Sequence, residues 1–557
     1  MKRIASLLLG LAMAAAALSG CGAQGRETAA QEFPDAVSIV LSDDGIIVDG
    51  KAVSTDGSAA VHTAHDIVCY ESGRDFTYGE GTEADEHTAE EAEAHTVVHI
   101  TQPGTYALSG TLSAGQIAVD LGEDAEDDPA AVVTLILNGV DITCTVAPAV
   151  IFYNVYECGS TDEDTASETV DTSAAGANVL IADGTINNVT GSYVARIYDP
   201  DSVVLSEDGM TVEDSGKLHK YDGAFYSKMS MNVDGGEAGT GVLNITADNE
   251  GLDTELHLTI NGGTINITSG NDGINTNEDN VSVTTVNGGS VNIQVTGETG
   301  EGDGIDSNGW LVINGGAVTA AACSDSGDAG IDATMGITIN GGTVAASGNM
   351  YDQIDGGAQN YVVFSFASRQ NGGQTYTLQN ADGETVGTWT LANDFTCLVV
   401  SSPDLTAGDY TLWQGDTQLA GTMSDGVGSP GGGRHMGGEA PPADLDPWQA
   451  PEGEVPENAG SEVPDDPPER RMGKWSLTVG NLSQAAAAPA AERAARAPRA
   501  CPRHSLCRMA GASLTGSHRR RQQKPLRRKD SGAGFPAPPA HIFFLMVLMA
   551  PFSSRLT

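Results

Sequence analysis

Aspartate and asparagine side chains recur in pairs along the middle of this 557-residue chain. The pairs lie around short Gly-containing turns and are Asp248 and Asp253, Asp272 and Asn275, Asp303 and Asp306, Asp328 and Asp332, and Asp352 and Asp355. Carboxylate and amide oxygens at mixed spacing suit Ca²⁺, which accepts about six to eight oxygen ligands, better than Mg²⁺ or Zn²⁺. All of these residues are therefore candidate calcium ligands.

The same part of the chain has no basic side chain to balance these acids, because no Lys or Arg occurs between Lys228 and Arg369. If the acids stack one strand spacing apart, at about 4.8 Å, neighbouring carboxylates repel by roughly 3 kcal/mol at an effective dielectric constant of about 20. A captured divalent cation would remove this repulsion. The alternative is that Asp and Asn occur here only because they fit turns and bond to the local backbone.

A repeated Asn-Gly-Gly tripeptide indicates which elements position the acids. Its four copies begin at Asn261, Asn287, Asn314 and Asn340, at intervals of 26, 27 and 26 residues. Apolar residues keep a constant offset from each copy, and the flanking segments alternate apolar and polar residues. Alternation predicts short strands with one buried face, and a fixed period of this length predicts stacked structural repeats.

Three apolar points per repeat predict three short strands per layer, and therefore an all-β parallel β-helix without helices in the repeats. The glycines of each tripeptide are expected at corners, where a positive φ or close packing of layers excludes a side chain. A leucine-rich repeat has a similar period, but its L-x-x-L-x-L-x-x-N spacing is absent. The nine-residue period of a calcium roll is absent as well.

The segments outside the repeats differ in character. Residues 80–95 are acidic and are expected to form a loop. Residues 361–422 contain aromatic strand segments with Asp382-Gly383 as a hairpin turn, which predicts a small antiparallel β unit that covers the open end of the stack. Five cysteines of the body have no spacing typical of a metal or redox site and are interpreted as small apolar residues; they are Cys69, Cys144, Cys158, Cys323 and Cys397.

The N-terminus predicts export and lipid attachment. Lys2 and Arg3 precede an apolar run that ends in Leu18-Ser19-Gly20-Cys21, which resembles a bacterial lipoprotein box. Residues 1–20 would then be a cleaved signal peptide, and Cys21 would carry the lipid. We expect the protein to be held at the outer surface of the bacterial cell membrane by this lipid alone.

Charge is distributed unevenly along the chain. Residues 473–557 hold 14 of the 27 basic residues but only two of the 75 acidic ones, so the remainder has 13 basic and 73 acidic residues, a formal charge of −60. Such a chain repels nucleic acid and anionic membranes and attracts divalent cations. The hypothesis for the basic tail is a frame-shifted, non-native extension, because it follows an export signal and a linker of opposite charge.

Several motifs together carry a family resemblance. They are the segment 221–228 (YDGAFYSK), Gly191 after 183–185 (DGT), the Asn-Gly-Gly repeats and the segment 410–415 (YTLWQG). Over about residues 37–440, the chain resembles the lipid-anchored carbohydrate-binding β-helix proteins of polysaccharide-degrading bacteria. It departs from their pattern at 229–231 (MSM), where an acidic pair is expected, so no metal ligand is assigned there.

The resemblance implies a pectate-lyase-like fold, a right-handed single-stranded parallel β-helix. It also implies bound calcium, with Asp222 of the first motif added to the ligands, and binding of cellulose and polygalacturonate. The predicted organisation is a signal peptide (1–20), a tether (21–36), a carbohydrate-binding β-helix (37–358), a small C-terminal β unit (359–425), a disordered Gly/Pro/acidic linker (426–472) and the basic low-complexity tail (473–557).

Three functions remain open from the sequence. The first is non-catalytic binding of an acidic pectic glycan or cellulose, with aromatic plates for sugar rings at Phe225, Tyr226, Trp310 and Tyr351. The second is a calcium-dependent polysaccharide lyase, for which Lys217, Lys220, Lys228, Arg196 and Arg74 are candidate bases from neighbouring layers. The third is a surface adhesin or spacer. No catalytic residue is assigned, since the repeats themselves contain no base of that kind.

Overall fold

The computed structural model describes residues 31–419 and 422–424, all within one compact unit of the chain. The predictions for the signal peptide, the Cys21 lipid anchor, the linker and the basic tail lie outside these residues. Among the described residues, no helix has both the length and the apolar composition needed to cross a membrane.

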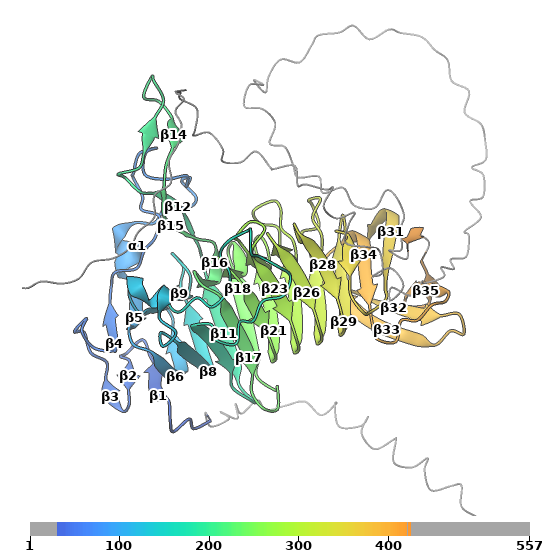
Figure 1. The fold of residues 1–557 in the computed structure, drawn as a ribbon, viewed down its shortest axis with the longest axis horizontal. Helices are drawn as coiled ribbons and strands as arrows, with labels where there is room; N and C mark the ends of the chain where they lie inside the picture. The colour runs from blue at the N-terminus through green and yellow to red at the C-terminus, as the bar shows by residue number, and fades with distance from the viewer. Residues whose placement is uncertain (1–30, 420–421, 425–557) are drawn as a thin grey trace, which may run out of the picture. The chain divides into compact units, whose positions relative to one another are not determined.

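Nearly every element is a β-strand, and most strand pairs are parallel, which confirms the all-β class. The strands of the repeats form three files in which each strand pairs with its equivalent in the next layer (Figure 1). One file is the eight-stranded sheet, made of β4 (Val61–Ala64), β5 (Thr96–Ile100), β7 (Gly115–Asp120), β9 (Val150–Asn154), β16 (Gly223–Ser227), β19 (Glu250–Thr254), β22 (Ile274–Thr276) and β25 (Ile305–Ser307).

The large sheet contains the other two files, which share the long strands β6 (Gly104–Leu112) and β8 (Val133–Thr143). The second file continues through β10 (Ala177–Ile181), β17 (Met231–Gly235), β20 (Leu258–Ile260), β23 (Val283–Val286), β26 (Trp310–Ile313), β28 (Gly336–Ile339) and β30 (Ile354–Gly356). The third continues through β11 (Ile186–Gly191), β18 (Val242–Ala247), β21 (Thr264–Ser269), β24 (Ser290–Val295), β27 (Ala317–Ala321) and β29 (Thr343–Gly348).

Register between layers follows the repeat. Ile265 pairs with Val291, Val291 with Val318, and Val318 with Val344, so the apolar residue after each Asn-Gly-Gly lies over its equivalent. All four side chains are buried in a core cluster that continues through the layers. Alternate residues of these strands point outward, which explains the apolar and polar alternation in the sequence.

The Asn-Gly-Gly corners are held by a ladder of side-chain amides. Asn287 donates from Nδ2 to Asn261 Oδ1 at 2.9 Å, and Asn314 and Asn340 continue the ladder at the same distance. The second glycine of each corner has a positive φ of +78° to +83°. A Cβ on the first glycine would lie about 2.5–2.6 Å from a carbonyl oxygen of the preceding layer at three corners. Both glycines are therefore required, for different reasons.

Antiparallel strands cover both ends of the stack. At the first end, β1 (Val37–Leu41) pairs in parallel with β6. The chain then turns back and forms the antiparallel strands β2 (Ile47–Val48) and β3 (Lys51–Ala52). At the other end, β29 pairs with antiparallel β34 (Phe395–Ser401). That strand belongs to a unit with its own apolar core, whose remaining strands are β31 (Tyr361–Gln370), β32 (Gln374–Asn380), β33 (Thr385–Leu391), β35 (Tyr410–Gln414), β36 (Thr417–Gln418) and β37 (Thr422–Ser424).

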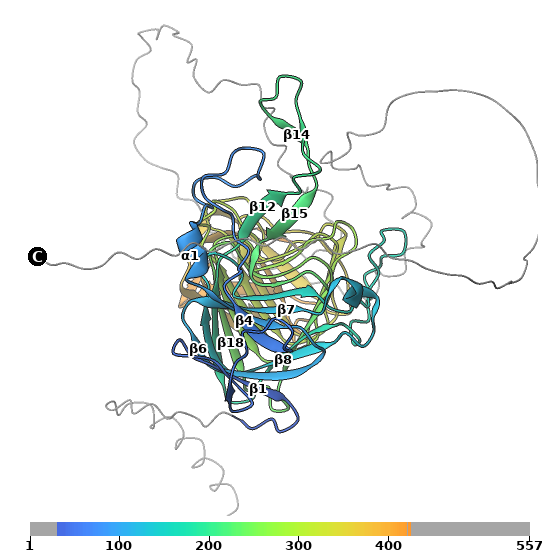
Figure 2. The same cartoon turned by 90° about the vertical axis from the view of Figure 1, so that its left-hand side faces the viewer.

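Two features were not anticipated from the sequence. A ribbon projects from the stacked strands (Figures 1 and 2), formed by β12 (Val194–Tyr198), β13 (Val204–Leu205), β14 (Val212–Asp214) and β15 (Lys217–Tyr221). The expected acidic loop 80–95 contains the short helix α1 (Ala89–Glu93), because Thr88 and Glu91 form a capping box at its start. A 3₁₀ turn, η1 (Glu123–Asp127), is the other helical element of the described residues.

We predict that Gly289→Ala lowers the free energy of unfolding by about 1–3 kcal/mol, because it places a side chain in the left-handed region. Its Cβ would also lie 2.6 Å from the Gly263 carbonyl oxygen. Gly327→Ala is the matched control, since a Cβ there meets nothing within 4 Å. Urea unfolding of the three proteins measures the difference. Equal losses in both variants would contradict the stacking account.

Candidate functional site: two acidic clusters between layers

The eight-stranded sheet brings the candidate metal ligands into one file. Asp253 of β19 pairs in register with Asn275 of β22, and Asn275 pairs with Asp306 of β25. The residue two positions before each of these is a glycine, at which a Cβ would lie about 2.3–2.6 Å from a carbonyl oxygen of the next layer. Equivalent acid and amide side chains of successive layers therefore lie in one file.

Asp222, Glu250 and Asp253 form the first acidic cluster. One carboxylate oxygen from each lies within 4.8 Å of the other two, and all three side chains are buried. Amides of the next layer hold one oxygen of two of these acids: Asn275 Nδ2 donates to Glu250 Oε1 at 3.0 Å, and Asn277 Nδ2 donates to Asp253 Oδ1 at 2.6 Å. These bonds fix the orientation of both carboxylates.

Three side-chain oxygens at this cluster have no hydrogen-bond partner. Glu250 Oε2, Asp253 Oδ2 and Asn275 Oδ1 are all buried and unbonded. A buried acceptor without a donor costs about 1–3 kcal/mol, and more if it is charged. Three such acceptors around one corner form a donor-free group of hard oxygens, and a divalent cation is the species that such a group binds best.

Glycine keeps space beside this cluster. A Cβ at Gly223 would lie 2.5 Å from Asp253 Cβ, so a side chain at this position would displace the carboxylate. Gly223 directly follows Asp222 and pairs with Glu250 across the layers. The close approach of the three acids therefore depends on the absence of a side chain at residue 223.

Burial and mutual repulsion govern the protonation of these acids. Desolvation raises the pKa of Glu250 well above its ordinary value, and Asp253 and Asp222 raise it further. Burial, with Asp222 and Glu255 nearby, likewise raises the pKa of Asp253 well above normal. The pKa of Asp222 is also raised by burial, although Lys220 opposes the shift. Without a cation, the cluster therefore tends to retain protons.

The first cluster has a positive side chain nearby, although the repeats contain no basic residue. The expectation that no Lys or Arg balances these acids is therefore wrong at this cluster. Lys220 of the ribbon strand β15 forms an ion pair with Asp222, and Lys217 lies 2.8 Å from Glu255 Oε1. Burial lowers the pKa of Lys220, but Asp222, Glu250 and Asp253 outweigh this and raise it above its ordinary value. One lysine thus offsets part of the charge of three carboxyls.

Asp303, Asp306 and Asp332 form a second cluster, again with one carboxylate oxygen each within 4.8 Å of the others. Burial, together with Asp272, Asp306 and Asp332, raises the pKa of Asp303 well above normal. Asp303 Oδ1 also accepts a hydrogen bond from the Ala329 N–H at 2.6 Å. This hydrogen bond opposes the rise in the pKa of Asp303.

The other predicted ligands are not gathered into these clusters. Asp248 is exposed, and the carboxylates of Asp272 and Asp328 accept backbone N–H groups of Asp303 and Gly302. Asp352 accepts from the Ala333 N–H of the preceding layer and from the Gln353 N–H beside it, and Asp355 is exposed in β30, which belongs to the second file. Most of these backbone bonds come from a neighbouring layer, so the alternative of local backbone bonding describes only the bond from Gln353 to Asp352.

Sequence reasoning missed Glu250. Asp248 was paired with Asp253 by its residue type, but strand register aligns Leu252 with Ile274 and Ile274 with Ile305. The residue before the glycine in each layer is therefore Glu250, Asp272 or Asp303. The signal was an acid-Gly-apolar-Asp/Asn tetrapeptide, in which Glu takes the place of Asp.

The proposed aromatic plates are corrected by burial. Phe225 and Tyr226 are 1% and 2% exposed and so offer no free ring to a sugar. Tyr226 is covered on its outer side by Tyr221 of the ribbon, with ring centroids 5.1 Å apart, and donates to Glu255 Oε1 at 2.6 Å. Trp310 is half-buried, and Tyr351 is half-buried against the core.

The five cysteines of the described residues are all unpaired. Cys69, Cys144 and Cys323 are buried, whereas Cys158 and Cys397 are half-buried. Burial raises the pKa of the Cys144 thiol to about 11, so it is protonated at neutral pH. This agrees with their interpretation as small apolar residues.

Residues 94–383 match the family described as carbohydrate-binding domain-containing protein, a span of more than half of the chain. The chain belongs to this family. A relative of the same description from Acetivibrio thermocellus is 29% identical over 126 residues, which are 22% of this chain and 35% of the relative. The alignment thus spans about a third of the relative's length. Membership of this family supports carbohydrate, in general terms, as the binding partner.

A solved structure is also similar to this carbohydrate-binding domain protein. It is that of the polysaccharide lyase-like protein from C. thermocellum, as a gadolinium derivative. The two share 22% sequence identity over 56% of this chain and 93% of the other, with a TM-score of 0.29.

We predict that in excess chelator the free energy of unfolding falls as the pH rises above about 4.5, the ordinary range of carboxyl titration. A raised pKa in the folded state means that folded Glu250 and Asp253 hold protons that the unfolded chain has released, so stability is lost as these protons leave. Glu250→Gln should make this fall shallower, by at most about 1.4 kcal/mol per pH unit.

Urea unfolding of both proteins between about pH 5 and pH 8 measures the effect. The lowered pKa values of His87, His219 and His257 act in the opposite direction, but they are common to both proteins and cancel in the comparison. Parallel pH profiles for the wild type and the variant would show that Glu250 is not a proton-holding group.

Proposed function

We propose that this protein binds acidic polysaccharide, such as polygalacturonate, through calcium held at the two acidic clusters. The observation that carries the proposal is the group of buried, unbonded oxygens on Glu250, Asp253 and Asn275. Asp222 completes the ligand set, with Asp303, Asp306 and Asp332 as a second site. We infer that the three strand files form a right-handed single-stranded parallel β-helix, with cellulose as a further glycan ligand.

Electrostatics explains why a metal is needed for such a ligand. The chain up to residue 472 carries a formal charge of −60, so a polyuronate approaches a surface of its own sign. Calcium takes about six to eight oxygens, and each cluster supplies fewer than that from its side chains. At the second cluster, where Asp303 and Asp306 are only half-buried, the remaining positions can accept uronate carboxylate oxygens, so the cation joins two anionic partners that would otherwise repel.

Export and anchoring belong to the same proposal. Cys21 would attach the chain to the outer surface of the bacterial cell membrane through lipid, with no other membrane contact. A protein on that surface meets extracellular polysaccharide and has free calcium available. The antiparallel strands at both ends of the stack would prevent edge-to-edge association there.

A polysaccharide lyase is the second candidate function, because Lys220 lies directly beside the first cluster. A lyase needs a cation to polarise the uronate carboxylate and a base to remove the α-proton. Lys220 is held in its protonated form by the carboxylates around it, which suits charge balance in the metal-free protein. A bound cation would weaken the preference of Lys220 for its protonated form, so the lyase reaction needs an assay of its own.

Calcium should raise the midpoint of thermal unfolding, and Asp253→Asn should reduce that rise by more than half. Asp253 supplies an unbonded buried oxygen, so its negative charge stabilises the folded state most when a cation is bound. Differential scanning fluorimetry across a calcium series measures it. The control is Asp248→Asn, because this exposed acid lies outside both clusters. An unchanged midpoint in the wild type at millimolar calcium would refute the metal site.

Polygalacturonate should retain the protein in a pull-down with calcium and release it when EDTA is added. Glu250→Gln should weaken retention about tenfold or more, because the loss of one charged ligand lowers cation affinity. Absorbance of unsaturated sugar products, followed in the same samples, separates binding from lyase activity, and Lys220→Ala is the variant that would abolish it. Retention that EDTA does not affect would contradict the proposed calcium dependence, and absence of retention in either condition would favour an adhesin or spacer.

A further inference from the structure

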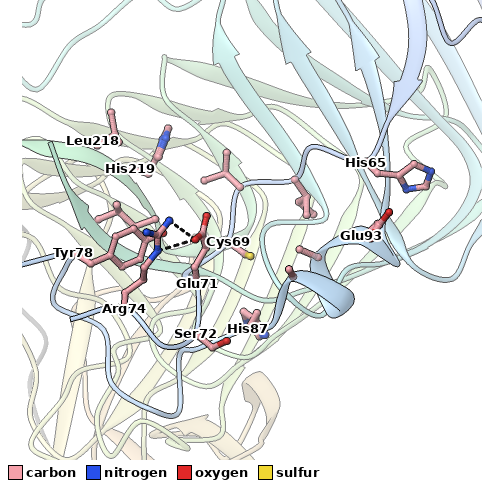
Figure 3. Close-up of a pocket in the computed structure, with 15 residues that line it drawn as sticks. His65, Cys69, Glu71, Ser72, Arg74, Tyr78, His87, Glu93, Leu218 and His219 are labelled. Carbon is pink, nitrogen blue, oxygen red and sulfur yellow. Dashed lines mark hydrogen bonds and ion pairs between the residues drawn. The ribbon is translucent and has the colours of Figure 1, made fainter. Parts of the chain in front are cut away.

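A cavity of about 710 Å³ lies between the segment 65–93 and the ribbon strands β12 and β15 (Figure 3). None of its lining residues belongs to either acidic cluster. Volumes of about 300–1,000 Å³ are typical of small-ligand pockets. Its size therefore suits a few sugar rings.

The two walls of this cavity are joined by main-chain hydrogen bonds. Gly79 forms an isolated antiparallel bridge with Ile197, the Glu80 N–H donates to the Arg196 carbonyl at 2.9 Å, and the Tyr198 N–H donates to the Tyr78 carbonyl at 2.9 Å. An ion pair between Arg196 and Glu80 at 2.8 Å reinforces the junction. The cavity is thus formed before any ligand arrives, which reduces the entropic cost of binding.

The wall formed by the segment 65–93 carries most of the polar side chains of the cavity. Arg74 donates from Nε to Glu71 Oε2 at 2.8 Å, and its guanidinium carbon lies 4.9 Å from the centre of the Tyr78 ring. Figure 3 shows Arg74 and Glu71 bonded to each other beside Tyr78, with Ser72 further along the same segment. Fixed donors and acceptors of this kind match the hydroxyl groups of a sugar.

The facing wall, on the ribbon, consists of Ile197, Leu218 and His219. Leu218 is 50% exposed, which is unusual for a leucine on a strand. Ala89 and Ala92 of α1, on the opposite wall, add further small apolar surface. A sugar ring has a polar rim and an apolar C–H face, so a pocket that offers both polar side chains and exposed apolar surface is complementary to it.

The charges in this cavity select against an acidic ligand. Burial lowers the pKa of His87 and of His219, so both imidazoles are neutral at pH 7. Arg74 is offset by Glu71, and Glu93 adds one further carboxylate to the lining. A uronate would therefore meet no uncompensated positive charge, whereas a neutral sugar needs none.

We propose that this cavity is a second, metal-independent glycan site that binds a short segment of an uncharged polysaccharide chain. It rests on the proposed function in one respect only, namely that polysaccharide is the ligand class of this protein. The acidic clusters would take charged sugar through calcium, and the cavity would take neutral sugar through hydroxyl and C–H contacts. The protein would then hold mixed plant-type polysaccharide at two points.

Isothermal titration of the full chain with cellohexaose in EDTA tests this inference. We expect saturable binding, with affinity at least tenfold lower in Arg74→Gln and in Leu218→Asn. Two matched controls should bind like the wild type. Arg369→Gln removes a comparable exposed Arg–carboxylate pair, Arg369 with Asp325, and Leu205→Asn replaces a leucine that is 40% exposed but does not line the cavity.

Absence of cellohexaose binding by the wild type in EDTA, or wild-type affinity in both cavity variants, would overturn the inference. Leu218 is exposed and forms no part of the core, so Leu218→Asn should fold even if Arg74→Gln does not, and thermal unfolding verifies this. Failure of calcium-dependent polygalacturonate binding would instead refute the proposed function. The two failures are distinguishable because they use different sugars and opposite metal conditions.

Discussion

Stacking of equivalent residues is the constraint on which the rest of this structure depends. Parallel pairing places each side chain about 4.8 Å from its equivalent in the next layer, so a residue type that recurs in the repeat forms a column. Apolar columns such as Ile265, Val291, Val318 and Val344 gain from this arrangement, since they form a continuous core. Amide columns gain as well, because each Asn donates to one neighbour and accepts from the other. Carboxylate columns are the exception, because they only repel.

The chain resolves that repulsion in several ways along one file. Asp272 and Asp303 accept backbone N–H groups from the following layer. Asn275 replaces an acid between Asp253 and Asp306 and thereby separates two charged layers. Lys220 reaches Asp222 from outside the repeats. At the first cluster, buried oxygens remain without donors. A bound cation would therefore stabilise the fold most at this cluster.

The sequence predicted those parts of the fold that depend on periodicity. Register, three strands per layer and the corner glycines all follow from the Asn-Gly-Gly spacing, since stacked repeats must place equivalent residues together. The C-terminal antiparallel strands were recognisable from the hairpin turn at Asp382-Gly383. Contacts made by non-repeated segments were harder to predict from the sequence. Lys220 and Tyr221 approach the file through the ribbon, so neither the lysine near the acids nor the burial of Tyr226 could be derived from the period.

A crystal structure of the protein grown with calcium would show whether the ion occupies the first cluster. Anomalous scattering measured at a long wavelength distinguishes calcium from water. We expect an anomalous peak within bonding distance of the oxygens of Asp222, Glu250 and Asp253. An ordered, closed cluster with no peak at millimolar calcium would contradict it.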